Sequence, residues 1–303
     1  MISHLRTIAA ALVAAGTAVG ASPVSAQSAP RTGTIIIAHG GDSTWNAGVR
    51  DVASAVRTGG PVEVSFLMGE GAKTARFQDA VAKLEKQGVA EIIVVPLLVS
   101  SHSGHYEQIR WLVGEQVTLS ESMTHHLHMA GIDRAATKLP VRLTRALDDA
   151  PEMARVLLER ARTLAASAGT EPSKRAVLIV GHGPNSAEDY AGWMQSLRPV
   201  ADSVRAWGGF RDVRVELVRD DAPAAVRAEA VLRVRELIDL QHLVTGQPVL
   251  VVPVLVSKGS VSRDKVPADI KGTPSVYSGL PLLPHLEMAR WVESRVREAL
   301  AAR

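Results

Sequence analysis

The chain repeats its own pattern, and this repeat limits the folds that it can adopt more than any other feature of its 303 residues. Three segments of the first half recur in the same order in the second half. They are TIIIAHGG at 34–41 and VLIVGHGP at 177–184, IIVVPLLVS at 92–100 and VLVVPVLVS at 249–257, and EMAR at 152–155 and at 287–290. We therefore predict two copies of one unit, at residues 31–168 and 172–303, joined by a linker rich in helix breakers.

Apolar runs rich in β-branched residues alternate with helical patterns in both copies. Long apolar runs of this kind favour strands that are buried on both faces, which is typical of a parallel sheet. The sequence therefore predicts an α/β protein made of two tandem doubly wound parallel-sheet domains related by internal duplication. The expected strands are 34–38, 62–68, 92–99 and 141–143, then 176–180, 213–218, 249–256 and 275–277, and helices are expected at 74–87, 151–166, 223–240 and 284–302, with Pro151, Pro223 and Pro284 in first helical turns.

The first 26 residues have the order of a secretory signal peptide. His4 and Arg6 lie near the start, an apolar run follows from Ile8 to Val19, and the small residues before Gln27 suit signal cleavage near Ala26. The apolar run is too short to cross a bilayer. We therefore expect a periplasmic or secreted protein that has no stable membrane insertion after cleavage.

Composition excludes several kinds of chemistry. The chain has no cysteine, which excludes thiolate metal sites, iron-sulfur clusters and cysteine nucleophiles, so any metal must be held by His, carboxylate or Met. A net charge of +3 and 4% aromatic residues give neither a basic stripe nor stacking rings, so no nucleic-acid partner is expected. The sequence also lacks a P-loop, an HExxH motif and a GxSxG motif, and Ala38 stands where a phosphohistidine phosphatase would need Arg.

Histidines follow two strands that should be neighbours. His39 comes directly after the first strand, and His102 and His105 follow the third. In open α/β sheets, ligands bind beyond the carboxyl ends of the strands where the strand order reverses, so an order 2-1-3-4 would bring these histidines together. Neutral imidazoles can hold a divalent metal of the Fe, Co, Ni or Zn type and leave coordination positions open.

These segments resemble the class II, ATP-independent tetrapyrrole chelatases, the CbiX/SirB family of sirohydrochlorin cobaltochelatases and ferrochelatases. The resemblance rests on IAHGG at 37–41, VPLLV at 95–99 with His105, and LPHLEMA at 283–289, and covers nearly the whole chain after residue 26. It implies two chelatase-like lobes that face each other across a cleft, with a tetrapyrrole and a divalent metal (Co, Fe or Ni) as substrates and no permanently bound cofactor. Metal insertion into a sirohydrochlorin-like tetrapyrrole is the activity that it implies, and the chain would be a monomer or a homodimer.

The resemblance also implies site residues. His39 matches the first histidine of the family, whereas the second falls on Gly104, so His105 is displaced by one position and His102 stands on the usual glycine. The family glutamate position holds Met68, and Glu70 is the nearest carboxylate. We therefore expect His39 and His105 to hold the metal and accept protons, with His102 or Glu70 assisting.

Several alternatives stay open at this stage. A non-catalytic periplasmic protein of the same fold, which binds a metal or a tetrapyrrole, is the second candidate, because tetrapyrrole synthesis is usually cytoplasmic. His182 is expected to be structural or to line the cleft, His285 to be structural and His242 to be exposed. The segment 107–140 is expected to form a lid or loop, and its histidines His125, His126 and His128 could bind a metal or a haem-like iron, or could be incidental.

Overall fold

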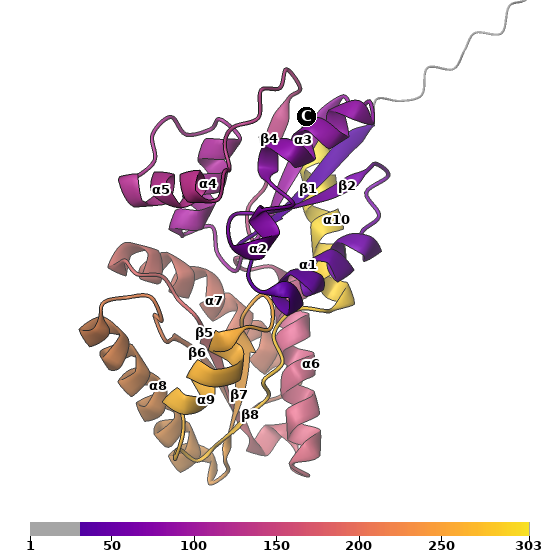
Figure 1. Ribbon diagram of the computed structural model, residues 1–303. Helices are drawn as coiled ribbons and strands as arrows, with labels where there is room; N and C mark the ends of the chain where they lie inside the picture. The colour runs from indigo at the N-terminus through magenta and orange to yellow at the C-terminus, as the bar shows by residue number, and fades with distance from the viewer. Residues whose placement is uncertain (1–30, 303) are drawn as a thin grey trace, which may run out of the picture.

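The computed structural model describes residues 31–302, so the predicted signal peptide lies outside the described residues. Two lobes, one above the other in Figure 1, are each built on a four-stranded sheet. The first half of the chain contains β1 (Thr32–Ala38), α1 (Ser43–Ala55), β2 (Val62–Phe66), α2 (Gly69–Ala72), α3 (Phe77–Lys86), β3 (Glu91–Leu97), α4 (Gly104–Leu112), α5 (Glu121–Met129), β4 (Val141–Leu143) and α6 (Pro151–Ser167). The second half contains a 3₁₀ turn (Pro172–Lys174), β5 (Ala176–Gly181), α7 (Ala187–Gly208), β6 (Asp212–Leu217), α8 (Ala224–Thr245), β7 (Val249–Val254), a π-helical turn (Val261–Lys265), α9 (Val266–Asp269), β8 (Ser275–Tyr277) and α10 (Leu286–Ala301).

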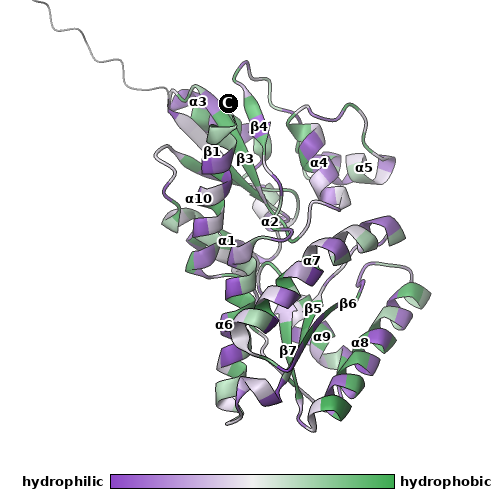
Figure 2. Ribbon diagram, turned by 180° about the vertical axis from the view of Figure 1, so that it is seen from behind, coloured by the Kyte–Doolittle hydropathy of each residue, from purple (hydrophilic) through white to green (hydrophobic). Residues whose placement is uncertain are grey.

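Both sheets are parallel and share one strand order. The first runs β2-β1-β3-β4 and the second β6-β5-β7-β8, with every neighbouring pair parallel. The central strands are buried on both faces: residues 34–38 of β1 and all of β5 are shielded from solvent. Figure 2 shows hydrophobic residues in these strands and hydrophilic ones on the outer helices. The predicted α/β class with two tandem parallel-sheet domains is thus confirmed.

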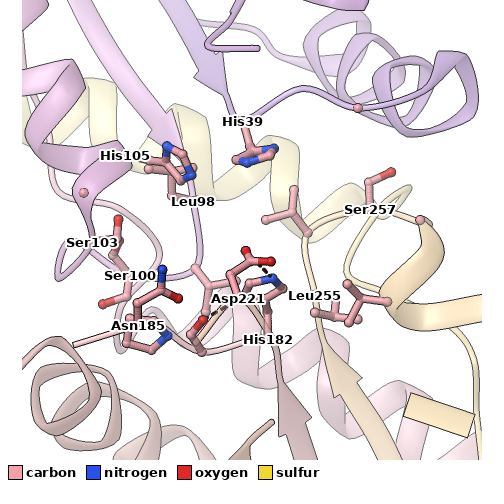
Figure 3. A pocket seen from close by; sticks show the side chains of 18 of the residues that line it. His39, Leu98, Ser100, Ser103, His105, His182, Asn185, Asp221, Leu255 and Ser257 are labelled. Atoms are coloured by element: carbon pink, nitrogen blue, oxygen red, sulfur yellow. Dashed lines mark hydrogen bonds and ion pairs between the residues drawn. The ribbon is translucent and has the colours of Figure 1, made fainter. Parts of the chain in front are cut away.

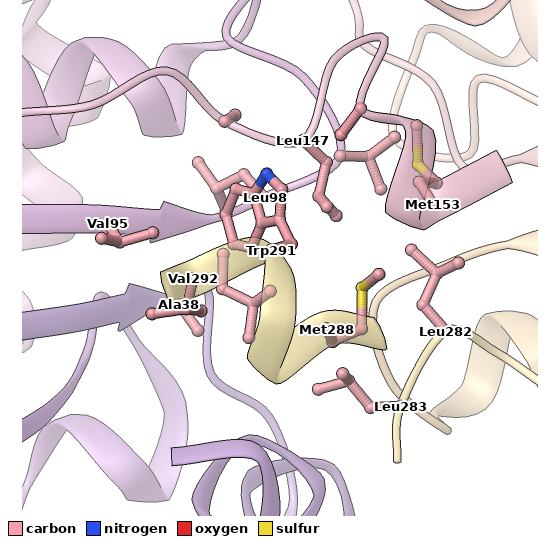
Figure 4. Close-up of a cluster of buried hydrophobic side chains, with 14 of the residues drawn as sticks. Ala38, Val95, Leu98, Leu147, Met153, Leu282, Leu283, Met288, Trp291 and Val292 are labelled. Atoms are coloured by element: carbon pink, nitrogen blue, oxygen red, sulfur yellow. The ribbon is translucent and has the colours of Figure 1, made fainter. Parts of the chain in front are cut away.

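The last helix of each half packs on the sheet of the other half. α6 contacts α7 and β7 of the second lobe, and α10 contacts α1 and β3 of the first. In Figure 4, Trp291 and Val292 of α10 lie beside Ala38, Val95 and Leu98 of the first lobe. The ranges 31–168 and 172–303 therefore describe the repeat in the sequence but not the two bodies in space, and that expectation is corrected.

Three local expectations were also wrong. The segment 107–140 contains the C-terminal part of α4 and all of α5, because Ser103 and Ser120 accept N-capping hydrogen bonds that start these helices. Pro223 and Pro284 precede their helices instead of lying in the first turns. The N-cap after Pro284 is His285, whose ring accepts a hydrogen bond from the Glu287 amide, so His285 has the expected structural role. His242 is half-buried, with Nδ1 2.9 Å from the carbonyl oxygen of Gln247.

Among residues 31–302, no helix is long and apolar enough to cross a membrane.

Candidate active site

The carboxyl ends of the two sheets face each other across a cavity of about 630 Å³. Its walls come from the segments after β1, β3, β5, β6 and β7, so both lobes contribute. Figure 3 shows His39 and His105 on the first lobe opposite His182 and Asp221 on the second. The apolar part of the wall includes Trp45, Leu98, Val99, Met123, Trp193, Leu255 and Val256.

His39 and His105 lie next to each other, as the strand order 2-1-3-4 predicts. Their ring centroids are 4.6 Å apart and the rings meet edge to face at 82°. His39 directly follows β1, and His105 is in the first turn of α4, which Ser103 caps at the end of the loop after β3. Gly40 allows the tight turn after His39, because its φ is +92° and a Cβ there would lie 2.2 Å from the carbonyl oxygen of Met68.

The hydrogen bonds of both rings leave the same nitrogen free. Nδ1 of His39 lies 2.7 Å from the Gly40 carbonyl oxygen, and Nδ1 of His105 lies 2.8 Å from Oε1 of Gln108. The Gln108 amide is oriented by its own donation to the Met123 carbonyl oxygen across 2.8 Å. Each Nδ1 therefore donates, and in the neutral ring the lone pair lies on Nε2, the atom that can bind a metal.

Burial keeps these two imidazoles neutral. Loss of solvent lowers the pKa of His39 below its usual 6.5, although its bond to Gly40 opposes this. Burial, and then the charge of His39, lower the pKa of His105 to about 4. Both rings are thus unprotonated at neutral pH, which is the form that coordinates a cation.

The equivalent histidine of the second lobe has a different environment. Nδ1 of His182 lies 2.7 Å from the Gly183 carbonyl oxygen, as His39 does with Gly40, but its Nε2 lies 3.2 Å from Oδ2 of Asp221. Both ring nitrogens face acceptors, which favours the imidazolium. Burial is the largest single effect and lowers the pKa of His182, but the hydrogen bonds to Asp221 and Gly183 and the charges of Asp221 and Asp220 together raise it above 6.5. The bond to His182 in turn lowers the pKa of Asp221.

A second carboxylate near His182 is already neutralised. His182, Asp220 and Asp221 are the one group within residues 31–302 whose ligand atoms all lie within 4.8 Å of one another. However, Asp220 is ion-paired with Arg227 at 3.2 Å and with Lys265 at 2.5 Å. Within the part of the chain that the structure describes, the second lobe therefore offers no three-ligand metal site free of competing ion pairs. The expectation that His182 lines the cleft agrees with its place in the cavity wall.

Two of the predicted metal ligands are not part of the cavity wall. His102 lies against α7, where a Cβ on Gly192 would be 2.4 Å from its Cγ and where its carbonyl oxygen accepts a hydrogen bond from Trp193 Nε1 at 2.6 Å. Glu70 is in the first turn of α2, exposed, and paired with Lys73 at 2.8 Å, because the chain turns at Gly69. The prediction that His102 or Glu70 assists at the metal is therefore not supported by their positions.

Sequence reasoning missed Asp221 and Gln108. Asp221 follows β6, so the rule that placed His39 at a strand end would also have pointed to it. Gln108 is three residues after His105, the spacing at which helical side chains are neighbours.

Comparison with known proteins relates the first half of the chain to one family, and the fold of the whole chain to several solved structures. Residues 33–164 match the family model CbiX, while no curated protein matches the chain. The fold is similar to "SirB from Bacillus subtilis with Fe3+", with a TM-score of 0.60 and 17% identity over 89% of this chain and 96% of that one. It is also similar to CbiX, described as the terminal enzyme for biosynthesis of siroheme in denitrifying bacteria, with a TM-score of 0.51 and 16% identity over 89% of this chain and 98% of that one.

A third structure, DR2241 from Deinococcus radiodurans, is described as a multi-domain protein with structural similarity to chelatases. It gives a TM-score of 0.53 at 20% identity, over 88% of this chain and 54% of that one. The two-lobed fold is thus shared with chelatases along most of the chain, while the sequence match lies in its first half. The first half of the chain is thus similar in sequence to the CbiX family, and the fold of both lobes is similar to that of the SirB and CbiX chelatases.

Proposed function

We propose that this protein is an exported chelatase that inserts Co²⁺ or Fe²⁺ into a sirohydrochlorin-like tetrapyrrole. The observation that carries the proposal is the pair formed by His39 and His105, whose Nε2 atoms are free of hydrogen bonds among the described residues and whose rings line the cavity between the lobes. No permanently bound cofactor is required, since the metal is itself a substrate.

His39 and His105 would hold the incoming metal through Nε2. Two imidazoles leave several positions of a first-row divalent cation open, which the pyrrole nitrogens of the macrocycle can take in turn. The neutral rings need lose no proton to bind the cation. The apolar side chains of Trp45, Leu98 and Leu255 suit the flat hydrocarbon surface of such a ring.

The protons released by insertion need a different acceptor. Each insertion breaks two pyrrole N–H bonds. A histidine that holds the metal has Nε2 on the cation and a proton on Nδ1, so neither ring nitrogen has a lone pair to accept a proton. We therefore assign proton uptake to Asp221, which faces this pair from the second lobe and whose orientation is fixed by His182. A pyrrole N–H becomes more acidic as its ring binds the cation, as metal-bound water does, and the partly exposed carboxylate can pass the proton to solvent.

The other two carboxylates of the cavity wall accept hydrogen bonds that stabilise helix starts. Asp42 Oδ1 accepts the hydrogen bond of the Trp45 amide as N-cap of α1, and Asp189 Oδ2 accepts one from the hydroxyl of Ser186. Asp221 therefore remains the carboxylate best placed for this step.

The second candidate is a non-catalytic periplasmic protein of the same fold, which holds a metal or a metallated tetrapyrrole. The predicted export signal at residues 1–26 favours it, because it would separate the protein from tetrapyrrole synthesis. Cleavage near Ala26, a periplasmic or secreted location, and a monomeric or homodimeric state remain predictions.

Metalation of sirohydrochlorin distinguishes the two candidates. Purified protein is mixed with sirohydrochlorin and Co²⁺, Fe²⁺ or Ni²⁺, without nucleotide, and the absorbance change is compared with that of buffer and of His39→Ala and His105→Ala variants. His242→Ala is the matched control, since His242 is on α8 and outside the cavity wall. We expect wild type and the control to be at least 100-fold faster than the two site variants. Protein that retains pigment but never accelerates metalation would identify the binding protein instead.

A further inference from the structure

α5 carries an unusual density of metal-binding side chains. Three of the ten histidines of the chain and two of its seven methionines lie within residues 123–129. This segment belongs to a regular helix, so the relative directions of these side chains are set by 3.6 residues per turn.

One face of α5 collects three of these donors. His125, His128 and Met129 are related by steps of three and four residues, which places them on the same side of the helix. Both histidines are exposed, Met129 is 72% exposed, and Leu127 is buried on the opposite side against the first lobe. Within residues 31–302, none of these three side chains makes a hydrogen bond or an ion pair, so all three are free to bind a ligand.

The same helix also borders the cavity. Met123 lines the cavity, and its carbonyl oxygen accepts the hydrogen bond that orients Gln108 behind His105. His126 is also exposed and lies on α5 between Met123 and His128. At about 3.6 residues per turn, the exposed donors lie between about half a turn and two turns along α5 from Met123.

Two imidazoles and a thioether define the class of ligand. Imidazole suits late first-row divalent cations, and a thioether adds preference for the softer members of that series. A hard cation such as Mg²⁺ or Ca²⁺, which prefers oxygen ligands, would gain little from these donors.

We propose that His125, His128 and Met129 form an outer site that captures a late first-row divalent cation, separate from the pair of His39 and His105. The ion then reaches the cavity along α5, past His126 and Met123. The outer site exists whether or not the cavity inserts metal, and only the transfer from it rests on the proposed function.

Binding stoichiometry tests the outer site. The full chain is titrated with Ni²⁺ at pH 7.5 in competition with a chromophoric chelator, as wild type, as His125→Ala with His128→Ala, as His39→Ala with His105→Ala, and with all four substitutions. We expect two ions, one, one and none. His242→Ala removes a half-buried histidine of α8 and should keep two ions. Met129→Leu should weaken binding of the outer ion several-fold. Far-UV circular dichroism establishes that each variant is folded.

The outcomes separate this inference from the proposed function. If His125→Ala with His128→Ala binds as many ions as wild type, the outer site is overturned, whatever the metalation assay shows. If the outer ion is present but sirohydrochlorin is never metalated, the chelatase proposal fails and the outer site stands.

Discussion

Oε1 of Gln108 accepts a hydrogen bond from Nδ1 of His105 across 2.8 Å, and this contact decides which nitrogen of His105 faces the cavity. Gln108 is fully buried, and its amide group is held in turn by the Met123 carbonyl oxygen. The ring orientation of His105 therefore depends on a residue that does not line the cavity.

Gln108→Leu should lower metal affinity about 10- to 100-fold, because His105 would lose the acceptor that fixes its tautomer. Competition titration with Ni²⁺ in the His125→Ala, His128→Ala background measures the cavity site alone. Nitrogen-15 NMR of the histidine rings should show His105 switching toward the other tautomer, which a general loss of packing would not cause. An affinity within twofold of the parent would contradict the positioning role.

Asp221→Asn should separate metal binding from metal insertion. The amide keeps the size of the side chain but is a far weaker proton acceptor, so insertion should slow about 100- to 10,000-fold. Metal affinity at His39 and His105 should stay within a few-fold, since Asp221 is not one of the proposed ligands. The measurements are the metalation rate and a Ni²⁺ titration on the same preparation. Equal rates for Asp221→Asn and wild type would remove Asp221 from the proton path.

Folding stability should fall on the acid side of neutrality because of His105. Its folded pKa of about 4 lies below the unfolded value of 6.5, so between these values the unfolded chain binds more protons and the free energy of unfolding decreases as pH falls. His182 acts in the opposite sense: its raised pKa contributes stability that is present below pH 6.5 and lost as pH rises through the folded pKa.

Replacing His105 with Gln should therefore reduce the acid-side loss by up to about 2 kcal/mol between pH 7 and pH 5. Urea unfolding at the two pH values measures it, and His242→Ala serves as the control. Parallel losses for wild type and His105→Gln would show that His105 does not titrate in this range on unfolding.

Gly192→Ala should destabilise the contact between the lobes. A Cβ at this position of α7 would lie 2.4 Å from Cγ of His102, so either the ring or the helix must move. Overpacking of this kind costs roughly 1–3 kcal/mol, measurable by urea unfolding. Because the clash is with one ring, adding His102→Ala to Gly192→Ala should recover most of the loss. No recovery would mean that the clash lies with another neighbour.

The strand-end rule placed some site residues correctly and missed others for physical reasons. His39 follows a strand directly, so the parallel sheet alone fixes its place. His102 and His105 follow β3 at a distance, and only the start of α4 after Ser103 turns one of them into the cavity and leaves the other against α7. Spacing in the sequence cannot show where a loop ends and a helix begins to that accuracy.

The packing of the final helices could not be predicted either. EMAR begins the amphipathic helices at 152 and 287, and both sheets offer similar apolar faces, so each helix fits either sheet. The path of the connecting segments decides the choice, and hydrophobic periodicity contains no information about that path.

The exchange of α6 and α10 between the lobes limits how the lobes can move relative to each other. Each half of the polypeptide contributes its last helix to the other lobe. The chain therefore passes between the lobes twice, once before α6 and once before α10. A protease cut near residue 170 would leave two fragments that remain interlocked rather than two independent domains. Any opening of the cavity between the lobes must then come from bending within both connecting segments, and not from rotation about a single hinge.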